Sequence, residues 1–143
     1  MTTMPDSFQG GCACGAIQYV CSGKFIASFN CHCRACQRYT GSAFMSGIVV
    51  PTDSFRFTSG EPTYYARQGD SGGEISRGFC ATCGSPVIAR LARLPHLIAI
   101  PAGSLNDPSW HKPMFDMFTS SAQPWDYMNP ELPKFPEGPP PKN

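Results

Sequence analysis

The sequence has no long hydrophobic run and no block of charge of one sign. No apolar stretch approaches the roughly 20 residues that a membrane span requires. The first ten residues contain neither a basic cluster nor an apolar core, so they do not resemble a secretory signal. The formal net charge of +1 is a poor electrostatic match to nucleic acid. We therefore expect a cytoplasmic protein with neither a membrane nor a nucleic acid as its partner.

Helical periodicity is also scarce, since no segment keeps it for more than two turns. Short runs of β-branched and aromatic residues alternate with glycine and proline, which is typical of a mainly β protein. The 143 residues suffice for one domain with its own core. We predict a small single-domain fold of short antiparallel strands over residues 1–136. Strands are expected at residues 16–21, 25–30, 43–50, 55–58, 62–66, 86–90 and 97–100, and residues 74–79 lead into the cysteine pair at 80 and 83.

The connections between these strands carry further expectations. The first two strands flank a turn at residues 22–24, and we expect them to pair as a hairpin. Residues 1–9 are expected to be a lead-in and residues 68–73 a polar loop. A helical turn is expected at residues 34–39, closed by Gly41.

The C-terminal quarter differs in composition, because ten of the fifteen prolines lie between Pro101 and the end of the chain. Six aromatic residues are interleaved with them. We predict an extended arm that wraps the β core with these aromatic side chains as anchors, followed by a proline-rich tail at residues 137–143. The aromatic residues are Trp110, Phe115, Phe118, Trp125, Tyr127 and Phe135.

Eight cysteines fall into tight clusters, with Cys21 alone. Eight in 143 residues is below the roughly 8–10% that is typical of disulfide scaffolds. Cysteines at positions i and i+2 share one face of a strand and usually cannot bond to each other. In a reducing cytoplasm, clustered cysteines favour metal ligation over disulfides.

Two cysteine pairs predict a structural zinc site. Cys80 and Cys83 have the spacing of a zinc knuckle, and Gly84 follows them. Cys12 and Cys14 point the same way on an extended backbone, so they can complete the set. Structural zinc takes four ligands in a tetrahedron. We therefore predict that these four cysteines hold one closed site that stabilises the fold.

The remaining cluster, Cys31, Cys33 and Cys36, predicts a site of another kind. Three protein ligands with a free fourth position describe a catalytic zinc site. In the alternative, Cys21 closes the shell and the site is structural; otherwise Cys21 is a small buried hydrophobe. His32 is a poorer fourth ligand, because it points to the opposite face if the strand continues.

The ligand type indicates what an open site would do. Three thiolates make zinc a weak Lewis acid for water and favour another sulfur as its ligand. A substrate thiol bound there would lose its proton, which favours attack of the thiol on an electrophile. Arg34 and Arg38 flank the cluster and could hold the carboxylates of an anionic substrate. The alternative is that both are ordinary solvated arginines.

The motifs together resemble the glutathione-dependent formaldehyde-activating enzyme family, whose relatives include centromere protein V. The resemblance implies a small zinc-bound β fold with two zinc ions per chain. It also implies structural ligands at Cys12, Cys14, Cys80 and Cys83, and catalytic ligands at Cys31, Cys33 and Cys36. The motifs are GGCACG at 10–15, CHCRAC at 31–36 followed by GSAF at 41–44, FCATCG at 79–84, AGSLNDP at 102–108 and QPW at 123–125.

The resemblance implies a carbon–sulfur lyase that joins glutathione to formaldehyde as S-hydroxymethylglutathione. Its partners would be a small-molecule thiol and a carbonyl compound, with Gly41 and Phe44 lining the pocket. Many relatives have a histidine near Asp116, so aspartate at this position points to a different thiol or carbonyl. Two alternatives remain: a non-catalytic binding module with two structural zinc sites, and a redox switch of the three-cysteine cluster.

Overall fold

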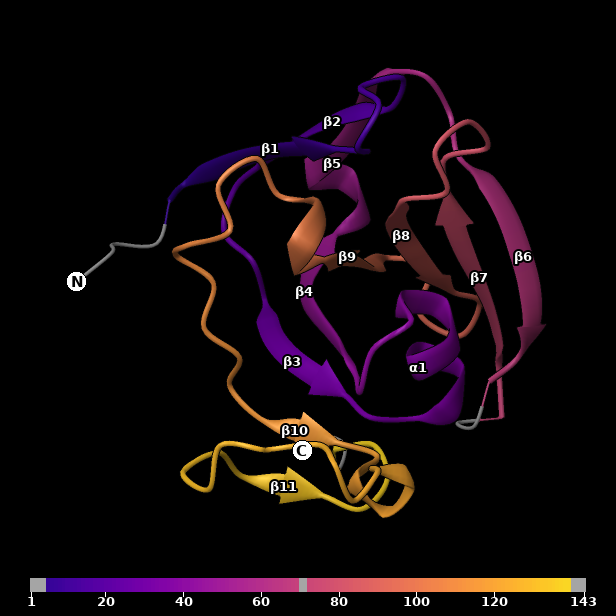
Figure 1. Ribbon diagram of the computed structural model, residues 1–143. Coiled ribbons are helices and arrows are strands. Elements are labelled where there is room, and N and C mark those ends of the chain that lie inside the picture. The colour runs from indigo at the N-terminus through magenta and orange to yellow at the C-terminus, as the bar shows by residue number, and fades with distance from the viewer. Residues whose placement is uncertain (1–4, 70–71, 140–143) are drawn as a thin grey trace.

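The computed structural model describes residues 5–69 and 72–139 (Figure 1). Part of the predicted lead-in (residues 1–4), part of the predicted loop (70–71) and most of the predicted tail (140–143) lie outside the described residues. In the described part, no helix is long and apolar enough to cross a membrane.

The strands form two sheets, and the structure confirms a mainly β fold. The smaller sheet has the order β1-β2-β5, and the larger one has the order β11-β10-β3-β4-β9-β8-β7-β6. All pairings are antiparallel except those that β10 makes with β3 and β11. The strands are β1 (Ser7–Gly11), β2 (Gln18–Ser22), β3 (Ala27–Cys31), β4 (Met45–Pro51), β5 (Phe55–Ser59), β6 (Thr63–Gln68), β7 (Glu74–Phe79), β8 (Pro86–Leu91), β9 (Leu97–Pro101), β10 (Asp116–Met117) and β11 (Lys134–Phe135).

The main core lies between the two sheets. Side chains alternate between the faces of a strand, so Ile48 and Val50 of β4 share one face with Ile100 and Ile98 of β9, which lie opposite them. These residues are fully buried and cluster with Tyr19 and its neighbours in the small sheet. A second cluster lies on the other face of the large sheet. It contains Phe29, Met45, Ala89, Ala99 and the three cysteines Cys31, Cys33 and Cys36.

The helix α1 (Arg34–Thr40) begins and ends as the sequence predicts. Cys33 is its N-cap, with the sulfur accepting a hydrogen bond from the amide of Cys36. Gly41 is its C-cap, with a φ of 70° that favours glycine, and its amide donates to the carbonyl oxygen of Gln37. The helix therefore starts within the three-cysteine segment, which fixes that segment's backbone. Within residues 5–69 and 72–139, the other helical elements are the 3₁₀ turns η1 (Thr52–Ser54), η2 (Ala102–Ser104) and η3 (Thr119–Ser121).

The predicted hairpin of residues 16–21 and 25–30 is wrong. β2 pairs with β1 and β5, whereas β3 pairs with β4 and β10 in the other sheet. The last three residues of the expected lead-in belong to strand β1, which pairs with β2 along an edge that a hairpin could use. After Gly23, which has a φ of 102°, the chain leaves the small sheet and enters the large one.

The C-terminal arm follows the outside of β3 and adds two short strands to the edge of the large sheet (Figure 1). Its predicted anchoring is correct for Trp110, which is buried against Phe8 and Phe25. It is wrong for Trp125 and Tyr127, which are 61% and 98% exposed. Between these two residues, the carboxylate of Asp126 lies 2.5 Å from His32 Nδ1 and ties this part of the arm to the core.

Candidate metal centres

The sulfur atoms of Cys12, Cys14, Cys80 and Cys83 all lie within 4.8 Å of one another. Cys14 Sγ is 3.7 Å from Cys12 Sγ and 3.8 Å from Cys80 Sγ. In a tetrahedral site with zinc–sulfur bonds of about 2.3 Å, neighbouring sulfurs are about 3.8 Å apart. This four-sulfur cluster therefore fits a zinc ion in both ligand number and spacing.

Two tight loops present these four sulfurs. The amide of Gly15 donates to Cys12 O (3.2 Å) and the amide of Gly84 to Cys80 O (2.7 Å). Ser85 joins the loops, because its hydroxyl accepts from the amide of Ala13 (3.0 Å) and lies 3.2 Å from Cys83 Sγ. Hydrogen bonds from the Ser85 side chain and backbone lower the pKa of Cys83 to about 5, which favours the metal-binding thiolate.

Cys31, Cys33 and Cys36 form the second cluster, again with all sulfurs within 4.8 Å. Cys31 ends β3, and the other two cysteines lie at the start of α1. All three are buried, with exposed fractions of 4–7%. Hydrogen bonds from Cys31 and Cys36, including the Cys36 amide, lower the pKa of Cys33 to about 2. This three-sulfur cluster fits a metal with one position left for an outside ligand.

Cys21 is not part of either cluster in the described part of the chain. It lies on β2 and packs into the main core with 1% exposure. Burial raises the pKa of its thiol to about 11. Of the two expectations for Cys21, the structure matches the small buried hydrophobe.

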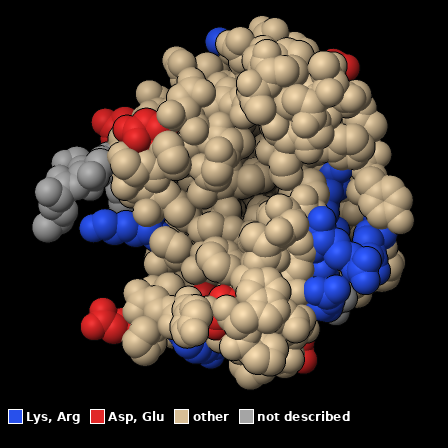
Figure 2. Space-filling model, viewed as in Figure 1, with Lys and Arg blue, Asp and Glu red and all other residues tan. Residues whose placement is uncertain are grey.

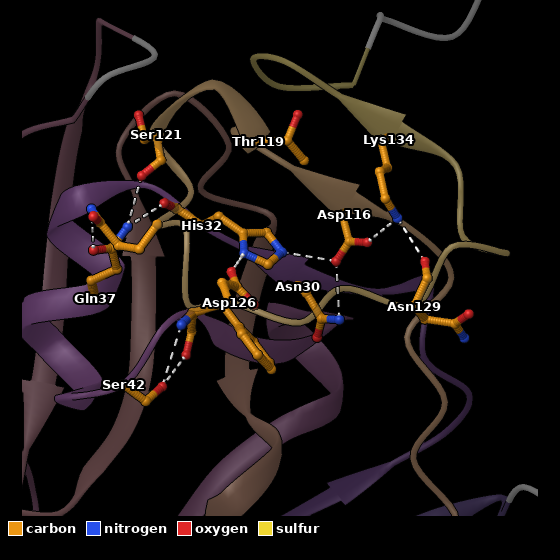
Figure 3. A network of polar contacts seen from close by, with 12 residues as sticks. Asn30, His32, Gln37, Ser42, Asp116, Thr119, Ser121, Asp126, Asn129 and Lys134 are labelled. Atoms are coloured by element: carbon orange, nitrogen blue, oxygen red, sulfur yellow. Dashed lines mark hydrogen bonds and ion pairs between the residues drawn. The ribbon is translucent and has the colours of Figure 1, made fainter.

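His32 is fully buried and lies between Cys31 and Cys33 in sequence, but both of its ring nitrogens face carboxylates (Figure 3). Nε2 lies 2.8 Å from Asp116 Oδ1, and Nδ1 lies 2.5 Å from Asp126 Oδ2. The ring therefore has no nitrogen left for a metal. Gln37 Nε2 donates to His32 O (2.7 Å) and to Ser121 O (3.1 Å), which ties the backbone of this segment to the arm.

Asp116 joins three elements at one buried carboxylate. It also accepts from Lys134 Nζ on β11 (2.9 Å) and from Asn30 Nδ2 on β3 (3.2 Å). Burial alone would raise the pKa of Asp116, but hydrogen bonds from His32, Lys134 and Asn30 outweigh it and hold the pKa below its ordinary value. In this chain, Asp116 therefore orients the residue between the first two cysteines of the three-sulfur cluster.

Arg77 is a charged neighbour of the three-sulfur cluster that sequence analysis missed. It lies on β7, is 7% exposed, and places its guanidinium carbon 5.9 Å from the centre of the Tyr39 ring. Its charge acts to lower the pKa of both Cys33 and Cys36, although for each cysteine the other sulfurs of the cluster have the larger effect. A single arginine in the stretch before Cys80 carries no sequence signal that it will be buried beside other cysteines.

Two of the cavities near the clusters are lined by residues of α1. The first, of about 430 Å³, lies between α1 and strands β6 and β7, and Arg38 and Arg77 line it. The second, of about 660 Å³, is lined by Cys12 and by Thr40, Ser42 and Phe44, among other residues. Pro86 lines both cavities, so they adjoin.

The four predicted substrate-binding residues are thus placed differently. Arg38 lines the first cavity and Phe44 the second. Gly41 caps α1 and lines neither of them. Arg34 is exposed at the start of α1 and donates to Gln37 Oε1.

The fold and the clusters together define a class: small β proteins in which two groups of cysteines, one of four and one of three, could hold metal ions. The profile of one family, described as glutathione-dependent formaldehyde-activating enzyme, matches residues 7–121. The chain belongs to this family.

A crystal structure of a Rhodobacter sphaeroides protein from a structural genomics programme has a similar fold. The TM-score is 0.56 at 18% sequence identity, over 88% of this chain and 98% of the other. No curated protein sequence matches the chain.

Proposed function

We propose that this protein activates a thiol, with glutathione as the first candidate, for addition to formaldehyde or a related carbonyl compound. The observation that carries the proposal is the buried group of exactly three sulfurs, which has no fourth ligand within the described part of the chain. The family assignment supports a small thiol and an aldehyde as substrates.

The residues have distinct roles in this proposal. Cys31, Cys33 and Cys36 would hold a catalytic zinc, which would supply a position where the substrate thiol loses its proton. Arg77 would offset the negative charge of the thiolates that hold the metal, since its charge acts to lower the pKa of Cys33 and Cys36. The second zinc would be structural, held by Cys12, Cys14, Cys80 and Cys83, because this four-sulfur cluster leaves no position open.

The reaction forms a bond between the thiol sulfur and the carbonyl carbon, and water provides a proton to the carbonyl oxygen. Its reverse breaks the same carbon–sulfur bond, which places the enzyme among carbon–sulfur lyases. We propose that Arg34 and Arg38 orient carboxylates of the thiol. Gly41 sets the turn that directs Phe44 to the second cavity. A reducing cytoplasm, where thiols persist, is the location that suits this chemistry.

The experiment is exchange NMR of glutathione and formaldehyde, which measures formation and breakdown of the adduct above the uncatalysed rate. We expect acceleration by the wild-type protein and by Cys21→Ala, the control for a cysteine outside the clusters. Cys36→Ser is expected to lose the acceleration while it keeps the metal of the four-sulfur cluster. Absence of acceleration by the wild-type protein at physiological thiol concentration would contradict the proposal and favour a non-catalytic binding module.

A further inference from the structure

Ser46 and His111 form a polar pair that belongs to neither cysteine cluster. His111 Nε2 lies 2.6 Å from Ser46 Oγ, which is the distance of a short hydrogen bond. Ser46 lies on β4, and His111 lies 65 residues later, on the C-terminal arm. A serine hydroxyl within hydrogen-bond reach of an imidazole is the arrangement that activates serine for nucleophilic attack. The pair is therefore a candidate for chemistry that is independent of the thiol reaction.

The hydroxyl of this pair faces the second cavity. Since alternate residues of a strand share a face, Ser46 points to the same side of the large sheet as Ile48, which is buried in the core between the sheets. Gly11 of the small sheet and Pro101 of the large sheet line the second cavity, and Ser46 lines it with them. His111 is not among the lining residues. A ligand in the cavity would thus meet the serine, with the imidazole behind it.

Contacts on both sides of His111 in the chain hold the ring in place. Trp110 is buried in the main core. The carbonyl oxygen of Lys112 accepts a hydrogen bond from Ser28 Oγ on β3 (2.6 Å). A catalytic base is usually oriented by a third group. Here the anchored backbone of the arm orients the imidazole toward Ser46.

The other ring nitrogen of His111 has no hydrogen-bond partner. Nδ1 is buried, and no group in residues 5–69 and 72–139 bonds to it; the same holds for Oδ1 of Asn30, which lies opposite Ser46 in the β3–β4 pair. Buried polar atoms are nearly always paired, and an unpaired one costs stability that a purely structural pair would not sacrifice. Burial also lowers the pKa of His111, so at pH 7 its imidazole is mostly neutral and can accept a proton.

The lining of the second cavity indicates a neutral ligand. Among the residues that the structure describes, no charged side chain lines it. Figure 2 shows uncharged residues over the centre of the face, where η2 and β4 lie in Figure 1, whereas lysine and arginine gather on the side of β6 and β7. A volume of about 660 Å³ suits an organic molecule. Apolar surface comes from Phe44, Met45, Pro86, Pro101 and Leu105.

We propose that this pair hydrolyses neutral carboxylic esters with an apolar acyl group, with Ser46 as the nucleophile and His111 as the general base. Ser46 Oγ bonds to the acyl carbon, while His111 Nε2 takes the hydroxyl proton and passes it to the leaving alcohol as the ester carbon–oxygen bond breaks. Water then attacks the acyl-serine and gives one proton, through His111, to Ser46 Oγ, and the carboxylic acid leaves. Asn106 lines the same cavity with an exposed side-chain amide, a donor for the oxyanion of the intermediate.

The first test follows release of p-nitrophenol from p-nitrophenyl butyrate. We expect Ser46→Ala and His111→Gln each to lower kcat/KM about 100-fold, because each removes one half of the activated nucleophile. The controls Ser22→Ala and His96→Gln, at exposed positions, should stay within about twofold of the wild type. Circular dichroism shows whether each variant is folded at the assay temperature. Hydrolysis by the wild type at the buffer rate, or equal rates for the wild type and folded Ser46→Ala, would overturn the inference.

The second test uses the wild type and separates a serine nucleophile from the cysteines. An alkyl fluorophosphonate forms a stable bond with an activated serine and releases fluoride, and peptide mass spectrometry locates the label. We expect one label per chain, on Ser46, and at least about tenfold slower labelling of His111→Gln. Label on a cysteine or on another serine, or no label, would overturn the inference. Label on Ser46 in a protein that accelerates no glutathione adduct would support the inference and contradict the proposed function alone.

Discussion

Replacement of Asp116 by asparagine isolates the buried carboxylate that orients the three-cysteine segment. The side chain is 1% exposed and contacts His32, Lys134 and Asn30 at 2.8, 2.9 and 3.2 Å. Hydrogen bonds to charged groups contribute about 1.5–3 kcal/mol each. Asparagine keeps the shape and one oxygen, but its amino group would face a donor, either His32 or Lys134. Lys134 is 33% exposed and can turn to water. The free energy of unfolding that Asp116→Asn loses is therefore about 2–4 kcal/mol, less than the loss from breaking a fully buried ion pair.

For a domain of this size, each kcal/mol lowers Tm by about 2–4 °C, so we expect a drop of about 10 °C. Urea unfolding followed by circular dichroism gives the free energy directly, with the exposed Asp53→Asn as the control. The folded pKa of Asp116 is depressed, so its contribution is present above the unfolded pKa of about 4 and is lost as pH falls through the folded value. The difference between wild type and variant should therefore shrink below about pH 4. A loss below about 0.5 kcal/mol at pH 7, similar to that of an ordinary surface substitution, would refute this reasoning.

Three further outcomes are expected. Gly47→Ala places a Cβ 2.7 Å from the Phe29 ring and should cost about 1–3 kcal/mol, whereas Gly103→Ala meets nothing within 4 Å and should be near neutral in the same melt. Burial lowers the pKa of His111, so the wild type should lose stability as pH falls below about 7. The stability of His111→Gln should depend less on pH over the same range. Equal slopes of unfolding free energy against pH for the two proteins would contradict this. Removal of metal by a chelator should lower Tm steeply, because the four-sulfur cluster joins residues 12–14 to 80–83; an unchanged Tm would argue against a structural metal.

Local sequence patterns predicted most of the strands but not how they pair. The strand predicted at residues 86–90 lies within β8, and the predicted end of α1 at Gly41 is correct, because capping and β propensity act within a few residues. The hairpin of residues 16–21 and 25–30 failed, because the turn at Gly23 is compatible both with a hairpin and with a crossing between sheets. That choice depends on β1, which buries Phe8 in the main core and occupies the edge of β2.

The grouping of the cysteines followed from ligand spacing, which is a local property with a strong chemical requirement. The residues that surround the three-sulfur cluster could not be predicted from ligand spacing. Arg77 lies near the three-sulfur cluster because of the strand register of β7, which passes beneath α1. Asp126 contacts His32 although the two residues are 94 positions apart in sequence. Such long-range contacts depend on the assembled sheet, and polar residues in strands and loops carry no pattern that marks them in advance.

Zinc content and zinc-edge X-ray absorption, measured for wild type and Cys36→Ser during a glutathione titration, test the open three-sulfur site most directly. We predict two zinc ions in the wild type and one in the variant. The wild-type shell should average about 3.5 sulfurs per zinc and rise to about 4 as glutathione binds, since one site has four protein sulfurs and the other three. A wild-type shell already saturated with protein sulfur, and unchanged by glutathione, would contradict the open site and favour a non-catalytic module.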